Sequence, residues 1–261
     1  LALYHPDRLR YCLKRTNPKG EDDPGWVRIS LADAFDEAGA KLNEIVEKYG
    51  GEANFAMGGT SRVWAQPPYG TLKSIFPTPN AHLAYEICKG PRHFAGILTD
   101  EIGSPWMEVE QGPLVYVQWG TAAEYSNYDS TNRTVVDCSQ RAYKHILVDP
   151  RMTPLGKEAD LWLPLRPGSD AALALAMLNT IIMERLYDKD FVATWCDGFE
   201  ELKEHVKPYN ARWAAPITWL SADQIKQAAR LYAKNTPGCI QWGCTWDQLG
   251  RSSTTASHAL A

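Results

Sequence analysis

The sequence predicts an α/β fold, in which strands alternate with helices. Short apolar runs that end at proline or glycine recur along the 261 residues, as in buried strands. Helical stretches with an amphipathic or wholly apolar pattern separate these runs. The pattern is fullest over residues 145–173, which read as a strand, a connector, a second strand, a turn and the start of a helix. This alternation is typical of an open sheet covered by helices.

The composition is that of an ordinary globular protein. Hydrophobic residues make up 44% of the chain and charged residues 22%, and the length suffices for one large or two small domains. A net charge of −4 gives no reason to expect nucleic acid or an anionic membrane as a partner. No apolar run approaches the length of a bilayer span, so we expect no direct membrane insertion. The ten tryptophans and twelve tyrosines suit a pocket for a flat ligand, although most are expected in the core.

The amino-terminal part is predicted to be a connector followed by one long helix. Residues 1–25 lack regular periodicity and are rich in proline, glycine and charge. Residues 26–49 have apolar positions at helical spacing and are predicted as a helix. Ser30 is its expected N-cap, with Asp33 three residues further on, and the pair Gly50-Gly51 ends it.

A short strand is predicted over residues 54–57, followed by the pair Gly58-Gly59. Glycine at such a turn lets backbone N–H groups approach a phosphate closely, although most turns of this kind are only turns. Residues 66–79 are rich in proline and are predicted as a loop. A further strand is expected over residues 114–118, with a loop over 119–126 at its end.

The stretch 145–173 has the strongest signal for a ligand. Its first apolar run ends at Asp149-Pro150, and its second, residues 161–165, ends at Arg166-Pro167-Gly168. Either Ser169 or Asp170 can then cap a helix over residues 171–185. A strand, a polar loop at its carboxyl end and a helix N-terminus together form the usual place for a nucleotide in an open α/β sheet.

The rest of the chain continues the alternation. Helices are predicted over residues 188–195, 199–206 and 223–233, the last after a Ser221 cap. Residues 238–243 are predicted as a strand, with a loop over 244–248.

The cysteines do not form a recognisable zinc site or disulfide framework. They stand at positions 12, 88, 138, 196, 239 and 244, without a C-x-x-C pair and without histidine at ligand spacing from the nearest two. We expect most of them to be small buried hydrophobic residues.

A nicotinamide-dependent dehydrogenase is excluded, because no G-x-G-x-x-G follows a predicted strand.

Several motifs, in a fixed order, resemble one family. DPRMTPLGKEADLWLPLRPGSDAAL, followed by LYDKDFV, is similar to the molybdopterin oxidoreductases of the dimethyl sulfoxide reductase superfamily. The resemblance extends upstream to YHPDRLRYCLKR and WVRISLADAFDEAGAKLNEIVEKYG, so it covers most of the chain. Within the family, the sequence is most similar to the acetylene hydratase and anaerobic dehydroxylase members.

The resemblance implies an architecture and a cofactor. Members hold molybdenum or tungsten on two molybdopterin guanine dinucleotides, and their fold contains two Rossmann-like lobes. We expect a connector over residues 1–29, a first lobe from 30–103 plus 238–261, and a second lobe over 104–237 that binds the guanine dinucleotide. Relative to the family, the iron–sulfur segment and the carboxyl-terminal cofactor-binding domain are missing, which predicts an internal piece of a longer protein. The compartment, cytoplasmic or periplasmic, therefore stays open.

The resemblance also places a metal ligand at Cys88. A thiolate suits a soft metal that dithiolene sulfurs already hold, and the neighbouring cations Lys89 and Arg92 would favour the thiolate. Arg92 and His93 would then donate protons or hydrogen bonds to the substrate. The alternative for Cys88 is a buried structural cysteine.

Other family positions predict contacts to the cofactor. Lys14 stands where the family keeps a lysine between an iron–sulfur cluster and the nearer pterin; the alternative is a solvated lysine. Gly58 and Gly59 would lie near the metal-bearing cofactor. The loop that grips the diphosphate corresponds to Trp119, Gly120 and Thr121. At its asparagine position this chain has Ala122, which leaves the backbone contacts but puts one side-chain contact in doubt.

Four residues of the stretch 145–173 complete the predicted site. Asp149 would accept hydrogen bonds from a ribose, and Arg151 would pair with phosphate. Gly168 and Asp170 would meet guanine, since a carboxylate matches the N1–H and N2 amino donors of that base. The alternative for Asp170 is a plain N-cap.

The implied function of the whole protein is two-electron or oxygen-atom transfer to a small substrate, in anaerobic metabolism, with an iron–sulfur electron-transfer subunit as a possible partner. A second reading keeps the cofactor without net redox, with the metal acting as a Lewis acid on water, as in acetylene hydratase. A third is an inactive scaffold subunit. By itself this stretch of chain is expected to catalyse poorly, because half of the pterin-binding surface would belong to other segments.

Overall fold

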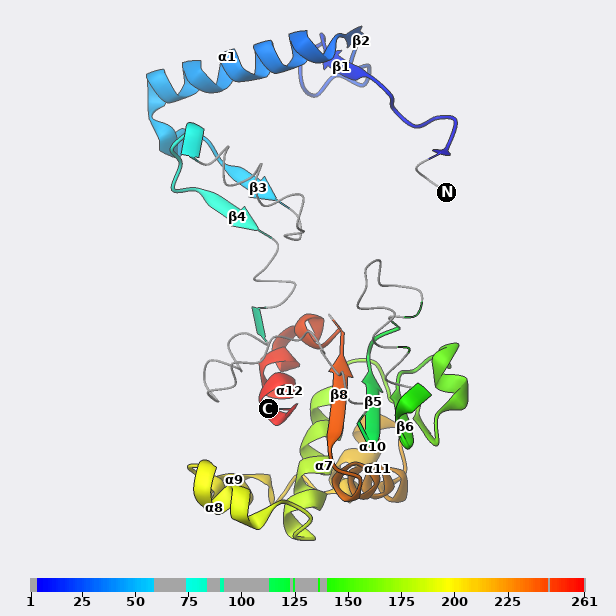
Figure 1. Ribbon diagram of the computed structural model, residues 1–261. Coiled ribbons are helices and arrows are strands. Elements are labelled where there is room, and N and C mark those ends of the chain that lie inside the picture. The colour runs from blue at the N-terminus through cyan, green and yellow to red at the C-terminus, as the bar shows by residue number, and fades with distance from the viewer. Residues whose placement is uncertain are drawn as a thin grey trace. The chain divides into compact units, whose positions relative to one another are not determined.

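The computed structural model describes residues 4–58, 74–83, 90–91, 113–122, 124, 136, 140–243 and 245–260. The chain divides into two compact units, Leu1–Tyr85 and Glu86–Ala261 (Figure 1). None of the described helices is both long and apolar enough to cross a membrane.

The first unit opens with a hairpin of two antiparallel strands, β1 (Cys12–Arg15) and β2 (Trp26–Ile29). The Arg15 side chain holds the intervening loop, donating hydrogen bonds to the carbonyls of Asn17, Pro18 and Glu21. The prediction of a helix starting at Trp26 is therefore wrong, because residues 26–29 form β2. Within the stretch 1–25, which was predicted to be irregular, Cys12–Arg15 forms β1. One side chain that binds three loop carbonyls leaves no periodic signal in the sequence.

The long helix of this unit, α1, spans Leu31–Tyr49, and the residues that cap its two ends are the predicted ones. Ser30 is the N-cap, and its hydroxyl accepts a hydrogen bond of 3.0 Å from the Asp33 N–H. Gly50 ends the helix with a positive φ of 86°. The apolar residues of α1 remain largely uncovered, with Leu31 and Phe35 exposed. After the 3₁₀ turn η2 (Gly51–Ala53), the strands β3 (Ala56–Gly58) and β4 (Ala81–Leu83) pair in parallel.

The second unit contains a parallel sheet with the strand order β7-β6-β5-β8. Its strands are β5 (Val115–Trp119), β6 (Lys144–Val148), β7 (Leu161–Leu163) and β8 (Gly238–Trp242). The pairing of β8 with β5 runs from Val115↔Gly238 to Trp119↔Trp242. The expectation that residues 238–261 rejoin the first lobe is therefore wrong. A short apolar run identifies a strand but not its partner in the sheet.

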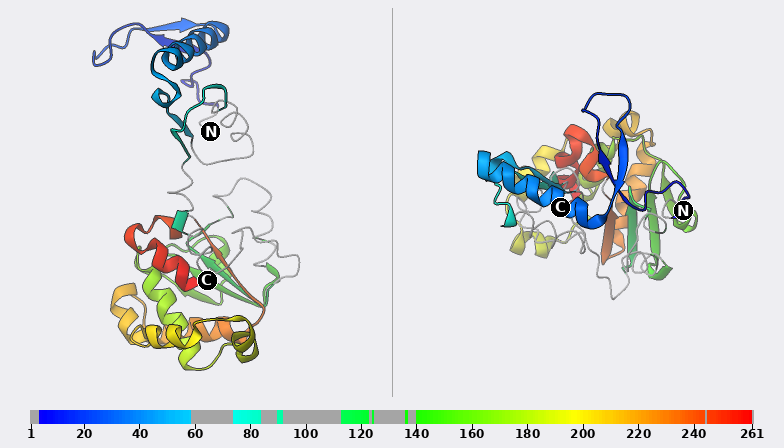
Figure 2. Two further views of the ribbon diagram at one scale, coloured as in Figure 1. Left: turned by 90° about the vertical axis from the view of Figure 1, so that its left-hand side faces the viewer. Right: turned by 90° about the horizontal axis from the view of Figure 1, so that it is seen from above.

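Helices α7 (Asp170–Met183), α10 (Ala211–Thr218), α11 (Ala222–Lys234) and α12 (Ser253–Leu260) pack against this sheet. Helices α8 (Lys189–Trp195) and α9 (Phe199–Val206) follow the far end of α7, as Figures 1 and 2 show. The 3₁₀ turn η3 (Leu155–Glu158) lies between β6 and β7, and the turns η4 (Trp246–Gln248) and η5 (Gly250–Ser252) lie between β8 and α12. The predicted helices correspond to α7, α8, α9 and α11. The sequence analysis missed α10, which has an Asn210 N-cap but is short and contains Pro216.

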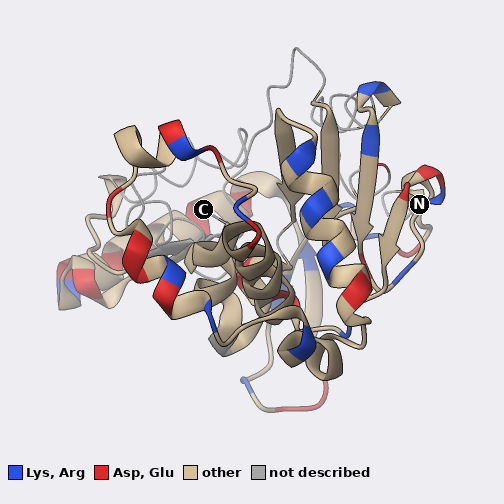
Figure 3. Ribbon diagram, turned by 90° about the horizontal axis from the view of Figure 1, so that it is seen from below, with Lys and Arg blue, Asp and Glu red and all other residues tan. Residues whose placement is uncertain are grey.

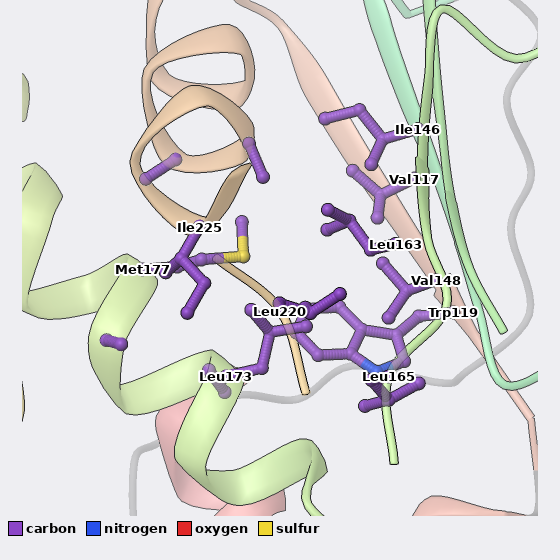
Figure 4. Close-up of a cluster of buried hydrophobic side chains, with 14 of the residues drawn as sticks. Val117, Trp119, Ile146, Val148, Leu163, Leu165, Leu173, Met177, Leu220 and Ile225 are labelled. Carbon is purple, nitrogen blue, oxygen red and sulfur yellow. The ribbon is translucent and has the colours of Figure 1, made fainter. Parts of the chain in front are cut away.

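The hydrophobic core lies between the sheet and α7, α10, α11 and α12. Alternate strand residues enter it, as the period of a pleated strand requires. Figure 4 shows Val117, Trp119, Ile146, Val148 and Leu163 of the strands facing Leu173, Met177, Leu220 and Ile225.

Charged residues of both signs are interspersed over the helices (Figure 3), and one pair of them joins two helices. Arg230 of α11 donates two hydrogen bonds of 2.7 Å to the two carboxylate oxygens of Glu184, the C-cap residue of α7. This bidentate pair lowers the pKa of Glu184, mainly through the hydrogen bond from Arg230. It joins the far end of α7 to α11.

The other face of the sheet is buried but polar. Tyr116 donates a hydrogen bond through its hydroxyl to Gln241 Oε1, and its ring lies 5.2 Å from that of His145. Burial lowers the pKa of His145 from 6.5 to about 4, against the weaker attraction of Asp160 and Glu124. The Nε2 atom of His145 has no hydrogen-bond partner among the residues that the structure describes.

We expect the stability of the second unit to depend on His145 in mild acid. The folded state prefers the neutral ring, so His145 stabilises the fold fully above its unfolded pKa of 6.5, and this stability is lost as the pH falls toward about 4. The shift corresponds to about 3 kcal/mol. Urea titrations at about pH 7 and about pH 4.5 should show a smaller acid loss for His145→Gln than for the unchanged protein. The exposed His205 supplies the control, His205→Gln. An equal loss in all three proteins would contradict the assignment.

Candidate functional site

The candidate site lies at one edge of the sheet in the second unit. Because its four strands are parallel, their carboxyl ends all meet this edge. The structure thereby brings together seven residues that the sequence analysis singled out. They are Trp119 at the end of β5, Gly120 and Thr121 after it, Asp149 and Arg151 after β6, Gly168 before α7 and Asp170 at its start.

Two backbone loops approach each other closely at this edge. Gly120 has a φ of +58°, and its N–H donates a hydrogen bond of 2.9 Å to the Val148 carbonyl. Its own carbonyl accepts a hydrogen bond of 3.0 Å from Thr245 Oγ1. A Cβ atom on Gly243 would lie 2.6 Å from that same carbonyl oxygen, so glycine is required there. The loops after β5 and β8 therefore form one surface.

The sequence analysis missed Gly243 and Thr245. A signal for them exists, because Gln118-Trp119-Gly120 and Gln241-Trp242-Gly243 repeat the same three residue types. The structure places these two triplets side by side in register on neighbouring strands. The repeat therefore marks two strand ends that lie at the same edge.

Asp170 is the buried acid of the site, with 3% of its surface exposed. Its Oδ1 accepts a hydrogen bond of 2.9 Å from Trp119 Nε1. Burial raises the pKa of Asp170, the Trp119 hydrogen bond opposes that rise, and the nearby Asp149 charge adds to it. In the described part of the chain, no second side chain donates to this carboxylate, so it retains capacity to accept hydrogen bonds.

Neither Ser169 nor Asp170 caps α7 with its side chain. Ser169 occupies the N-cap position, but its hydroxyl donates a hydrogen bond of 2.6 Å to the Arg166 carbonyl. The Asp170 carboxylate contacts Trp119 instead of the helix backbone ahead of it. The plain N-cap reading of Asp170 therefore does not explain its side chain.

Trp119 is itself fixed in position by aromatic packing. Its ring lies 4.8 Å from that of Trp246 at an angle of 70°, and Trp246 lies 5.7 Å from Trp242 at 86°. These are edge-to-face contacts, which favour one orientation of each ring. The indole N–H that holds Asp170 is thus set by residues from β5, β8 and η4.

Asp149 is equally buried and adjoins an exposed cation. Its Oδ1 accepts hydrogen bonds from the Arg151 backbone N–H at 2.8 Å and from Arg151 Nε at 3.3 Å. The backbone carbonyl of Asp149 accepts a hydrogen bond of 2.9 Å from Trp162 Nε1. The acid is thereby held at the end of β6, while the Arg151 side chain remains largely exposed at the same edge.

Gly168 leaves open space at the turn before α7. Its φ is +82°, and a Cβ atom added to it would meet no atom within 4 Å.

The Gln118 side chain holds the loop after β5, because its Nε2 donates hydrogen bonds to the Thr121 carbonyl at 2.9 Å and to the Glu124 carboxylate at 3.2 Å. Ala122, at the position where the family has asparagine, is buried.

The other predicted site residues are only partly described. Lys14 forms an ion pair with Glu37 of α1, and its side chain is about half exposed. Gly58 is the last residue of β3. The residues proposed for the metal and the substrate (Cys88, Arg92 and His93), together with Gly59, lie outside the described residues. Among the residues that are described, no three His, Cys, Asp or Glu side chains form a group that could hold a metal ion.

The geometry at this edge suits binding of a nucleotide. It combines two buried carboxylates, two glycine turns with positive φ, a helix N-terminus and an exposed arginine. A carboxylate at a strand end can accept hydrogen bonds from ribose hydroxyls, and one beside a helix start can accept them from a base edge.

Comparison with known proteins gives a consistent result. A family model described as molybdopterin oxidoreductase matches residues 8–223. Dopamine dehydroxylase from Eggerthella lenta is 50% identical over 239 residues, which cover 88% of this chain and 23% of that protein. Acetylene hydratase from Syntrophotalea acetylenica is 37% identical over 260 residues, which cover 98% of this chain and 34% of that protein.

A solved structure shares the fold. The acetylene hydratase of Pelobacter acetylenicus matches with a TM-score of 0.74 at 35% identity, covering 98% of this chain and 35% of that chain. The α/β architecture of the chain is therefore that of this enzyme. The chain spans only about a quarter to a third of the length of these relatives.

Proposed function

Because the chain belongs to the molybdopterin oxidoreductase family, within the dimethyl sulfoxide reductase superfamily, we propose that its strand-end site binds the guanine dinucleotide part of a molybdopterin cofactor. The observation that supports this most directly is Asp170, a buried carboxylate held by Trp119 with no second side-chain donor in the described part of the chain. Guanine offers two adjacent N–H donors on one edge, which a carboxylate can accept together.

The other residues at the edge fit the remaining parts of the dinucleotide. Asp149 at the end of β6 accepts hydrogen bonds from the ribose hydroxyls, and Arg151 beside it pairs with a phosphate. The backbone of Gly120 and Thr121 lines the path of the diphosphate. The space beside Gly168 leaves room for the base, since nothing lies within 4 Å of a Cβ atom placed there.

We propose further that the whole protein is a molybdenum or tungsten enzyme with two such dinucleotides. When bound, the cofactor supplies a metal centre for two-electron or oxygen-atom transfer to a small substrate. Cys88 would provide the thiolate ligand, and Arg92 and His93 would orient the substrate or deliver protons. Lys14 would lie between the pterin and an iron–sulfur cluster of another segment, which an electron-transfer subunit could supply with electrons.

Redox chemistry is our preferred reading over hydration. A relative named dopamine dehydroxylase is 50% identical, whereas one named acetylene hydratase is 37% identical. The second candidate, a non-redox hydratase, is supported by the longer coverage, 98% of the chain against 88%. The third, an inactive scaffold subunit, would not need a buried carboxylate at the strand ends that can still accept further hydrogen bonds, as Asp170 can.

The test is a chemical analysis of the intact protein purified without oxygen. Molybdenum, tungsten and iron are measured by elemental analysis, pterin by fluorescence after oxidation, and GMP after acid release. We expect molybdenum or tungsten with two guanine nucleotides per chain, and the iron content reports an iron–sulfur cluster. A protein without metal, pterin or GMP would disprove the enzymatic reading and leave the scaffold. Metal and pterin without GMP would disprove the guanine dinucleotide form alone.

A further inference from the structure

Trp219 has a backbone conformation that its residue type disfavours. It is the C-cap of α10, with φ +63° and ψ 13°, in the left-handed region. Glycine and asparagine are the usual residues at such helix ends, because a Cβ atom is strained there, and a bulky aromatic residue is an outlier. Strained residues of this kind gather at binding sites, where another contribution offsets the strain.

Core packing does not account for the choice of tryptophan at this position. The neighbours of Trp219 are anchored, since Thr218 is fully buried and Leu220 packs in the core close to Trp119 and Leu165 (Figure 4). Trp219 itself is 71% exposed. The backbone at this position is therefore held rigidly while most of the residue remains accessible to a ligand.

The end of α10 is joined directly to the turn that precedes Asp170. The Arg166 backbone N–H donates a hydrogen bond of 2.9 Å to the Thr218 carbonyl. Arg166 Nε donates a second one, also of 2.9 Å, to the Ile217 carbonyl. Arg166 is two residues before Gly168 and four before Asp170. Trp219 and the proposed guanine site are therefore parts of one hydrogen-bonded unit.

We propose that Trp219 is the stacking residue for the base whose edge Asp170 binds. A purine held by its edge leaves its two flat faces exposed, and an indole against one face excludes water and fixes the plane of the ring. The open space at Gly168 lets the base approach the turn. This assignment rests on the proposed guanine dinucleotide site. Trp219 would stack on any aromatic base, whereas Asp170 selects guanine.

The chain offers a matched control in Trp195. It is also highly exposed, at 77%, but it ends α8, which follows the opposite end of α7. The length of α7, about 21 Å, separates that end from the site. Replacing Trp195 therefore removes an exposed indole of the same second unit without touching the strand-end loops.

The experiment is a calorimetric titration of the intact, cofactor-free protein with GMP and with AMP. For Trp219→Gly we expect about tenfold weaker binding of GMP, or about 1.4 kcal/mol. AMP binding should weaken by a similar factor, because stacking does not depend on the base. Trp219→Phe should keep most of the affinity, and Trp195→Ala should keep all of it. Asp170→Asn should weaken GMP much more than AMP.

A purely structural role for Trp219 would make the Trp219→Gly protein less stable than the unchanged protein. We expect no such loss, because glycine adopts a positive φ without strain, so Trp219→Gly should unfold at the same temperature as the unchanged protein or higher. Unchanged GMP binding by Trp219→Gly, with binding still lost in Asp170→Asn, would overturn the stacking role and leave the guanine site standing. No GMP binding by the unchanged protein, together with no GMP released from the cofactor-loaded protein, would overturn both.

Discussion

Replacing Asp170 by Asn is expected to remove the guanine dinucleotide from this site while the fold stays at least as stable. The carboxylate accepts both N–H donors of guanine, whereas the amide accepts one and presents its own donors to the other. Hydrogen bonds to a charged group contribute about 1.5–3 kcal/mol each, so the loss of one corresponds to a roughly tenfold to hundredfold weaker affinity. The amount of GMP released per chain from the purified protein measures the effect.

The stability part of this prediction follows from the pKa of Asp170. Burial raises that pKa above its ordinary value of 3.8, so the charged form is less favourable in the folded state than in the unfolded chain. An acid whose pKa is raised in the folded state destabilises the protein as the pH rises. The unchanged protein therefore loses stability as the pH rises from 3.8 through the raised pKa of Asp170, and the full cost is present above that pKa. Asp170→Asn removes that cost and keeps an oxygen for the Trp119 N–H.

Asp223 provides the control for this substitution. It is an exposed acid in the first turn of α11, as Asp170 is a buried one in the first turn of α7. Asp223→Asn should change neither the GMP content nor the pH dependence. Full GMP content in Asp170→Asn would refute the assigned role of the carboxylate, and a large loss of stability would refute the argument from its pKa.

Replacing Trp119 by Ala is expected to cause the largest loss of stability in the second unit. The ring is almost fully buried between Trp246 and the core residues of α7, and its truncation leaves a cavity that the parallel sheet cannot close. Such substitutions cost about 3–5 kcal/mol. Urea unfolding of the chain, followed by circular dichroism, measures the change in the free energy of unfolding.

Trp119→Phe separates the ring from its N–H group. Phenylalanine keeps much of the apolar contact but leaves the Asp170 carboxylate without its indole donor, which should cost about 1–3 kcal/mol. In the Asp170→Asn background the same replacement should cost less, because a neutral amide is less costly to bury unpaired. Trp213→Phe on α10, where the ring is partly exposed, is the control. Equal costs of Trp119→Phe in both backgrounds would show that the charge of Asp170 adds nothing to the hydrogen bond from Trp119.

Much of the secondary structure was predictable because its signals are local. Ser30 and Ser221 cap their helices as expected, and Gln224 completes a capping box at Ser221. The strands at residues 144–148 and 161–163 and the helix that starts at Asp170 also lie close to their predicted positions. Each of these signals depends on residues within one or two turns of the chain.

The candidate site was predictable in its residues but not in its contacts. Asp149 and Asp170 stand at predictable element ends, because the order of strand, loop and helix is visible in the sequence. The hydrogen bond from Trp119 to Asp170 joins residues 51 positions apart, and no spacing rule relates them. The strain at Trp219 depends on how α10 ends against the Arg166 turn.

The sequence by itself therefore determined the class of fold, the helix ends and the family, since these depend on local periodicity, capping and motifs in order. Only the tertiary structure decided that β8 pairs with β5, that Gly243 meets the Gly120 carbonyl, and that Trp119 donates to Asp170. The physical reason is the same in each case. The choice of partner between distant segments depends on which arrangement buries the most apolar surface with every strand paired, and that is a property of the whole chain.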